Sequence, residues 1–140
     1  MPSTPSGPEG PRRPYGRCGH KVGLCSSTHF TRSELASRDG SCEMDPRFLT
    51  ALEHYREHLG RPVYLLSAYR SRADNHRVNG ATKSQHLYGR AADLKSPSRM
   101  PLAEVRGLHI FTGLGVARDG SVSHVDLRPG DRHSPTVWFY

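Results

Sequence analysis

The chain has 140 residues, which suits one domain with room for a hydrophobic core. It contains no run of 18 apolar residues, so we expect no transmembrane helix and no membrane partner. A net charge of +7 would suit a polyanion, either nucleic acid or an anionic cell-wall polymer. The basic residues are scattered, however, and no nucleic-acid-binding motif accompanies them, which argues against nucleic acid as the partner.

The first 28 residues differ in composition from the rest of the chain. They are rich in Pro, Gly, Ser and Arg and show no apolar periodicity. We therefore expect residues 1–28 to be a disordered or loosely attached arm, and residues 29–140 to form the folded domain. The arm lacks the apolar stretch of a Sec-type signal peptide.

The chain has three cysteines, an odd number that rules out a complete disulfide framework. Cys18, His20 and Cys25 do not match a common zinc-binding spacing. We expect ordinary thiols, or one bridge between Cys18 and Cys25, with Cys42 unpaired.

Two helices are predicted in the first half of the domain. A capping-box pattern at 31–34 predicts a short helix that ends in a turn at 38–40. The main helix is predicted to begin after Asp45, a suitable N-cap, with Pro46 in its first position and Gly60 after its end. Its apolar residues recur at helical spacing: Phe48, Leu49, Leu52, Tyr55 and Leu59.

The middle of the chain shows apolar runs that are typical of strands. Residues 62–69 form a short, partly β-branched run that predicts a buried strand. Residues 85–88 and 91–94 are expected to be short extended pieces folded about Gly89.

The last third of the domain contains a predicted hairpin. Residues 101–108 suit a short helix, and two strands are expected at 113–117 and 122–127. The Asp119-Gly120 pair between them is a strong hairpin signal. We expect an α+β fold in which one main helix and several short helices accompany a small, largely antiparallel sheet.

Two histidines and two carboxylates near these strands are ligand types for a divalent metal. His124 and Asp126 lie two apart on a predicted strand, so their side chains should share one face. His86 and Asp93 are seven apart, and a bend at Gly89 could bring them together. Two His and one Asp would leave a position open, and zinc held in this way lowers the pKa of a bound water to about 7. The pattern predicts a hydrolytic zinc site.

The same residues resemble the signature of a known family. The pattern Ser-x-His-x-x-Gly-x-Ala-x-Asp followed by a later His is that of the zinc D-alanyl-D-alanine carboxypeptidases and the L-alanyl-D-glutamate endopeptidases, relatives of the vancomycin-resistance dipeptidases and of the hedgehog signalling domain. Residues 67–71, Asn75 and 79–81 look like the Tyr-Arg segment and following loop of this family. The resemblance covers roughly 29–138. The signature residues here are Ser84, His86, Gly89, Ala91, Asp93 and His124.

The resemblance implies a hedgehog-like peptidase fold and a role for each matching residue. The implied Zn²⁺ ligands are His86, Asp93 and His124. Arg70 would bind the substrate carbonyl or carboxylate and stabilise the developing oxyanion. Ser84 would contact the substrate or a ligand, and Tyr88 would either line the substrate cleft or pack in the core. Two further arginines, Arg90 and Arg128, flank the ligands and could favour an anionic peptide.

The general base is the point at which the chain departs from the family. Many members have Asp or Glu three residues before the second His, where this chain has Ser121. Asp126 is the better local candidate because it should share a face with His124, although it could instead hydrogen-bond a ligand His. Asp119 is a weaker candidate, since turn chemistry already explains it. The third alternative is that neither residue is the base, which includes an attenuated or inactive site.

We therefore predict a monomeric zinc metallopeptidase that hydrolyses a peptide bond involving a D-amino acid in the peptidoglycan stem peptide, as a carboxypeptidase or an endopeptidase. Without a signal peptide, it would be cytoplasmic, or phage-associated and released by a non-Sec route. The alternative is a cell-wall-binding module that zinc stabilises and that does not cleave. An iron(II) site built on His124 and Asp126 fits the chain length less well.

The remaining candidates are expected to be structural. His54 and His58 lie four apart on the main helix, but no metalloprotease pattern joins them. Trp138, in the tail at 137–140, is expected to plug the sheet or to contact the substrate.

Overall fold

The structure is a computed structural model that describes residues 25–140. Residues 1–24 of the predicted arm at 1–28, including Cys18, lie outside the described residues. Cys25 forms a disulfide with Cys42, and the Cα atoms of the two residues are 6.0 Å apart. The expected thiol at Cys42 and the expected Cys18–Cys25 bridge are therefore wrong, because the fold brings together two cysteines that are 17 residues apart in sequence.

The first two helices begin and end where the capping residues predict. Helix α1 (Arg32–Leu35) carries the capping box, in which Thr31 and Glu34 each accept a hydrogen bond from the other's backbone amide. Helix α2 (Pro46–Leu59) begins after Asp45, whose side chain accepts a hydrogen bond from the amide of Arg47. It ends at Gly60, which has a left-handed conformation with φ 76°.

The strands of residues 25–140 form one five-stranded sheet in the order β1-β2-β4-β3-β5. Neighbouring strands are antiparallel except for β3 and β5, which are parallel. The predicted α+β class with a largely antiparallel sheet is thus confirmed. The strands are β1 (Leu65–Ser67), β2 (Ala91–Leu94), β3 (Gly113–Val116), β4 (Val122–Asp126) and β5 (Thr136–Phe139).

Three predicted elements differ from the structure. The expected buried strand at 62–69 is reduced to β1, an edge strand whose Leu66 is 61% exposed. The segment expected to be extended at 85–88 is instead a 3₁₀ helix, η1 (Gln85–Tyr88), because the side chain of Ser84 caps it. The expected tail is the strand β5, which pairs with β3. The other short helices are α3 (Arg72–Arg77), η2 (Ser96–Ser98) and α4 (Leu102–Gly107).

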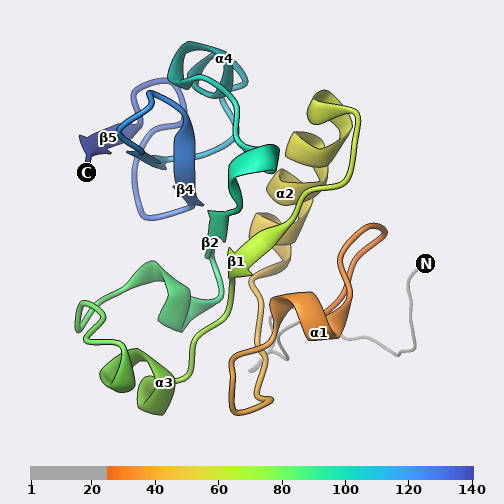
Figure 1. Cartoon of the computed structure of the whole chain (residues 1–140), viewed down its shortest axis with the longest axis vertical. Helices are drawn as coiled ribbons and strands as arrows, with labels where there is room; N and C mark the ends of the chain where they lie inside the picture. The colour runs from red at the N-terminus through yellow and green to blue at the C-terminus, as the bar shows by residue number, and fades with distance from the viewer. Residues whose placement is uncertain (1–24) are drawn as a thin grey trace.

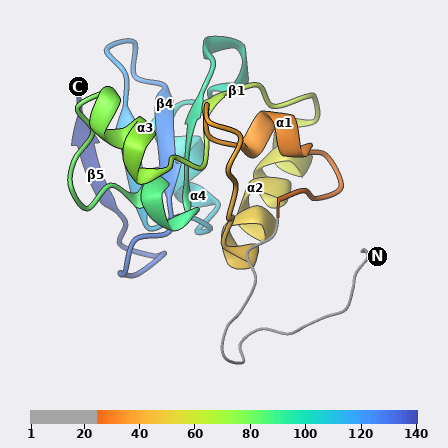
Figure 2. The same cartoon turned by 90° about the horizontal axis from the view of Figure 1, so that it is seen from below.

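The hydrophobic core lies between helix α2 and one face of the sheet (Figures 1 and 2). A row of paired residues crosses four strands on this face: Ala92, Val125, Leu114 and Val137. Helix α2 contributes Phe48 and Tyr55, whose rings both contact the ring of Phe111. None of the described helices is long and apolar enough to cross a membrane. Because the core occupies one face, polar side chains that alternate with it gather on the other.

Candidate metal centre

One row of paired residues crosses all five strands on the face opposite the core. Strand register places Ser67 beside Asp93, Asp93 beside His124, His124 beside Gly115, and Gly115 beside Trp138. Directly opposite residues on one face of a sheet lie about 5 Å apart at Cβ. The sheet therefore brings Asp93 and His124 together although they are 31 residues apart in sequence.

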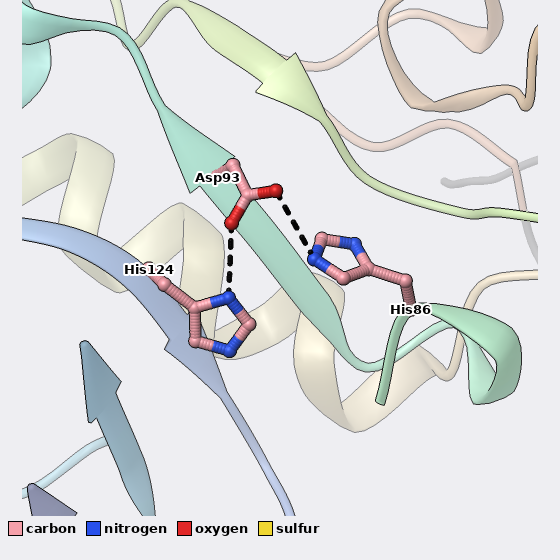
Figure 3. Close-up of side chains that lie close together, drawn as sticks. All are labelled: His86, Asp93 and His124. Carbon is pink, nitrogen blue, oxygen red and sulfur yellow. Dashed lines mark hydrogen bonds and ion pairs between the residues drawn. The ribbon is translucent and has the colours of Figure 1, made fainter. Parts of the chain in front are cut away.

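The third member of the group comes from outside the sheet. Helix η1 points the side chain of His86 at the same carboxylate, so that Asp93 lies between the two imidazoles (Figure 3). His86 Nε2 is 3.2 Å from Asp93 Oδ2, and His124 Nδ1 is 2.9 Å from Asp93 Oδ1. One donor atom from each of the three residues lies within 4.8 Å of the others. Within residues 25–140 this is the group of three His, Cys, Asp or Glu side chains that could hold a metal ion.

The chain between His86 and Asp93 turns back at Gly89, as predicted. Gly89 has φ 68°, a left-handed conformation that glycine adopts without strain. A Cβ at this position would also collide with the backbone carbonyl of Glu43. The amide of Asp45 donates to the carbonyl of Gly89 over 2.9 Å. The turn is thus packed against the segment that leads into helix α2.

His86 is oriented by the backbone that follows strand β1. Its Nδ1 is 2.7 Å from the carbonyl oxygen of Ala68, which can only accept a hydrogen bond, so Nδ1 carries a proton. The amide of Arg70 donates to the carbonyl of His86 over 3.1 Å. Nε2 is the other ring nitrogen, and it faces Asp93.

His124 is oriented by a side chain. Its Nε2 donates to Asp126 Oδ2 over 2.8 Å, and Nδ1 is left to face Asp93. Asp126 is 0% exposed. Arg128 donates to the same carboxylate from Nε, Nη2 and its backbone amide. The predicted shared face of His124 and Asp126 is confirmed.

The carboxylates of the group are anionic at neutral pH. Burial raises the pKa of Asp93, but hydrogen bonds from His124 and His86 outweigh it and hold that pKa well below its usual value of 3.8. Burial also raises the pKa of Asp126, yet the contacts with His124 and Arg128 lower it to about 2. Two imidazole nitrogens and one carboxylate oxygen are a donor set that zinc prefers in proteins, and a bound metal would take the place of the protons that the two imidazoles share with Asp93.

The structure places Arg70 beside this group. Its Nη2 is 3.8 Å from Asp93 Oδ2, and its Nη1 donates to Asn75 Oδ1 over 2.9 Å. Asn75 is buried and donates in turn to the carbonyl of Ala81. At Gly80 a Cβ would collide with the amide oxygen of Asn75, so the loop needs glycine there. The guanidinium is thereby held near the metal ligands.

Other predicted site residues lie around the group. Ser84 accepts a hydrogen bond from the amide of His86 and caps η1. Tyr88 is 51% exposed, which excludes the core position, and Arg90 stacks on its ring. Asp119 accepts hydrogen bonds from the amide and hydroxyl of Ser121 within the hairpin turn.

Two residues at the site were missed by sequence reasoning or assigned another role. Ser67 Oγ donates to Asp93 Oδ2 over 2.8 Å, a contact that only the register of β1 against β2 could reveal. Trp138 packs beside His124, with ring centroids 5.2 Å apart, and Arg128 stacks on its ring at 4.5 Å. His54 and His58 on helix α2 lie outside the metal-binding group, and His58 Nε2 is 3.0 Å from Glu104 Oε2.

Comparison with known proteins agrees with this arrangement. The Peptidase M15 family matches residues 27–126, which include all three members of the metal-binding group. A zinc D-Ala-D-Ala carboxypeptidase from Streptomyces albus G is 36% identical over 84 residues, which make up 57% of this chain and 33% of that protein. The chain thus spans about a third of the length of this curated relative. The resemblance predicted from the signature residues is confirmed: the chain belongs to the peptidase M15 family.

Proposed function

We propose that this protein is a zinc peptidase that hydrolyses a peptide bond involving a D-amino acid in the stem peptide of peptidoglycan. The observation that carries the proposal is the convergence of His86, Asp93 and His124, with the guanidinium of Arg70 beside them. The similarity of the chain to the zinc D-Ala-D-Ala carboxypeptidase from Streptomyces albus G supports both the metal and the substrate class.

The residues around the metal-binding group would have different roles in such a reaction. Three of them would hold the metal: His86, Asp93 and His124. Zinc held by three protein ligands acts as a Lewis acid and allows water to be a nucleophile near neutral pH. Arg70 would bind the scissile carbonyl oxygen and stabilise its negative charge as the carbon becomes tetrahedral. Ser67 and Asn75 hold the carboxylate of Asp93 and the guanidinium of Arg70 in place.

Metal content and digestion of purified muropeptides test this proposal together. The wild-type protein should contain about one zinc per chain and release a product that mass spectrometry identifies. A His86→Ala, His124→Ala double variant should lose both properties. A control with two exposed histidines replaced, His54→Ala and His76→Ala, should keep both. Undiminished cleavage by the first double variant would refute the proposal.

Arg70 offers a test that separates substrate binding from metal binding. Loss of one positioned donor to an oxyanion lowers kcat by about 10² to 10³ in enzymes of known mechanism. Arg70→Ala should therefore lower kcat/KM by about that factor while zinc content stays unchanged. Arg132→Ala, at an exposed position, is the matched control. If Arg70→Ala cleaves as well as the wild type, Arg70 has no role in the reaction.

A cell-wall-binding module without catalysis is the second candidate. The observation that favours it is Ser121, which stands where many family members have an acid. Wild-type protein that binds zinc and sedimenting cell walls, yet releases no product from any muropeptide, would establish this function in place of hydrolysis.

The disulfide bears on where the protein would act. The bond between Cys25 and Cys42 favours an oxidising environment. Of the two locations left open by the sequence, it supports release from the cytoplasm to the outside of the cell membrane, where peptidoglycan lies.

A further inference from the structure

We propose that Asp126 is a positioning residue that fixes the tautomer of His124, so that Nδ1 is the nitrogen offered to the metal. This inference rests on the proposed zinc site and assigns Asp126 a role other than the general base. It follows from how the carboxylate is held on the side of the imidazole away from Asp93.

Both oxygens of Asp126 are already engaged. Oδ2 accepts from His124 Nε2 at 2.8 Å and from Arg128 Nη2 at 2.7 Å. Oδ1 accepts from the Arg128 backbone amide at 3.1 Å and from its Nε at 3.0 Å. The residue is completely buried. A general base needs an oxygen within hydrogen-bonding reach of the attacking water. Here the imidazole of His124 stands between the carboxylate of Asp126 and that of Asp93.

The carboxylate of Asp126 and the guanidinium of Arg128 fit against the sheet because strand β3 has a glycine beside them. Gly113 on strand β3 lies directly opposite Asp126, and a Cβ there would collide with Asp126 Oδ1. The guanidinium of Arg128 is in turn stacked on Trp138, which itself packs against His124. The imidazole of His124 is therefore held by three residues that also contact one another: Asp126, Arg128 and Trp138.

When Nδ1 of His124 gives up its proton to bind a metal, the carboxylate of Asp126 keeps the remaining proton on Nε2 by accepting its hydrogen bond. Metal-binding histidines usually donate their other ring N–H in this way, and removal of the acceptor typically weakens metal binding by about 10- to 100-fold. Because Arg128 donates two hydrogen bonds from its side chain and one from its backbone, it also decides how any replacement at residue 126 is turned.

Asp126→Asn is the informative change. The three donors of Arg128 would attract the amide oxygen of Asn, so its NH₂ group would face His124. Nε2 would then have to accept a hydrogen bond, the proton would move to Nδ1, and His124 could not bind the metal through that atom. We expect zinc affinity, measured by competition with a chromogenic chelator, to fall by about 10- to 100-fold. Nitrogen-15 correlation spectra of the imidazoles at alkaline pH should show a larger fraction of the Nδ1–H tautomer of His124 in the metal-free variant than in the metal-free wild type, because only Asp93 still accepts a hydrogen bond from the ring.

The controls separate this inference from the proposed function. Asp131→Asn, the same change at an exposed position, should bind zinc like the wild type. A wild-type protein that binds no zinc would overturn the proposed function and the inference together. Wild-type zinc affinity in Asp126→Asn, with the His124 tautomer unchanged, would overturn the inference alone. If kcat were lost in that variant while its zinc affinity equalled that of the wild type, Asp126 would be the base.

Arg128→Gln provides a second test if Asp126→Asn does not fold. Gln cannot donate to both oxygens as the guanidinium does, so the carboxylate would be held less firmly. Zinc affinity should fall several-fold, whereas Arg132→Gln at an exposed position should leave it unchanged. Equal zinc affinity in Arg128→Gln and wild type would contradict the proposed support of His124.

Discussion

The two imidazoles of the metal-binding group face the same carboxylate but are held by different parts of the molecule. His86 presents Nε2, and its other nitrogen donates to the backbone carbonyl of Ala68. His124 presents Nδ1, and its other nitrogen donates to the buried side chain of Asp126. The backbone carbonyl of Ala68 remains an acceptor after any substitution that preserves the backbone, whereas a single substitution removes the carboxylate of Asp126. The half of the site around His86 should therefore respond mainly to changes in chain path, and the half around His124 to changes of side chain.

The largest effect is expected where the chain path of the His86 half is disturbed, at Gly89. Gly89→Ala combines a left-handed conformation, which costs about 1–2 kcal/mol, with a collision against backbone, which costs about 1–3 kcal/mol. Chemical denaturation should show a loss of about 2–5 kcal/mol, together with weaker zinc binding. Gly120→Ala has the same type of backbone but open space around its Cβ, so it should lose only the conformational part. Equal losses in the two variants would mean that the contact with Glu43 is unimportant.

The disulfide should have the next largest effect, also on the His86 half. It fixes Cys42 beside the segment that packs against the Gly89 turn. Closing a loop between residues 17 apart stabilises a fold by about 3 kcal/mol in the chain-entropy model. Cys42→Ser should therefore lose about that much in thermal or chemical unfolding without reductant. Addition of a reductant should lower the stability of the wild type to that of the variant and leave the variant unchanged. A wild-type protein insensitive to reductant would contradict this prediction.

A substitution at Gly113, which lies opposite Asp126, tests the half of the site around His124. In Gly113→Ala the new methyl group would displace the carboxylate of Asp126, at a cost of about 1–3 kcal/mol for overpacking. Zinc affinity should fall as well, because His124 loses its acceptor. Gly107→Ala, on helix α4 with open space around its Cβ, should be neutral or slightly stabilising. Normal zinc binding by Gly113→Ala would show that His124 does not depend on the position of Asp126.

The smallest expected effect is a pH dependence of the free energy of unfolding, which arises from the contacts of His124 with Asp126 and Asp93. Burial lowers the pKa of His124, but hydrogen bonds to Asp126 and Asp93 outweigh it and raise the pKa above its usual 6.5. The metal-free folded state thus holds a proton more tightly than the unfolded state does. This contribution to stability is complete below pH 6.5 and is lost as the pH rises through the raised folded pKa.

Denaturation of the metal-free protein at a series of pH values checks this sign. Stability should decline from weakly acidic to alkaline pH, and the decline should be shallower in Asp126→Asn, which lacks one of the two carboxylates that raise the pKa. An identical slope in the two proteins would show that Asp126 does not contribute to it.

Local features of the fold could be predicted because local hydrogen bonds determine them. Asp45, Pro46 and Gly60 define the ends of the main helix within one turn of each residue. The Asp119-Gly120 turn likewise sets the hairpin between β3 and β4. The His86, Asp93 and His124 group was predicted from the signature pattern, and the structure brings these side chains together.

Features that depend on distant partners could not be predicted. The pairing of Cys25 with Cys42 and the addition of β5 to β3 depend on which segments the whole fold brings side by side. Strand alternation correctly placed Asp126 on the face of His124. It could not show on which side of the imidazole the carboxylate lies, because that depends on Arg128 and on the missing side chain at Gly113.

The position of Trp138 has a practical consequence for work on this site. It is the single tryptophan of the chain, and its indole ring lies against His124, which is one of the three metal-binding side chains. Indole emission is sensitive to a neighbouring imidazole, and a protonated imidazole quenches it. Intrinsic fluorescence should therefore change when His124 gains a metal ion or loses a proton. Trp138 fluorescence could therefore report on His124 without an added label, in the half of the site that side-chain substitutions alter.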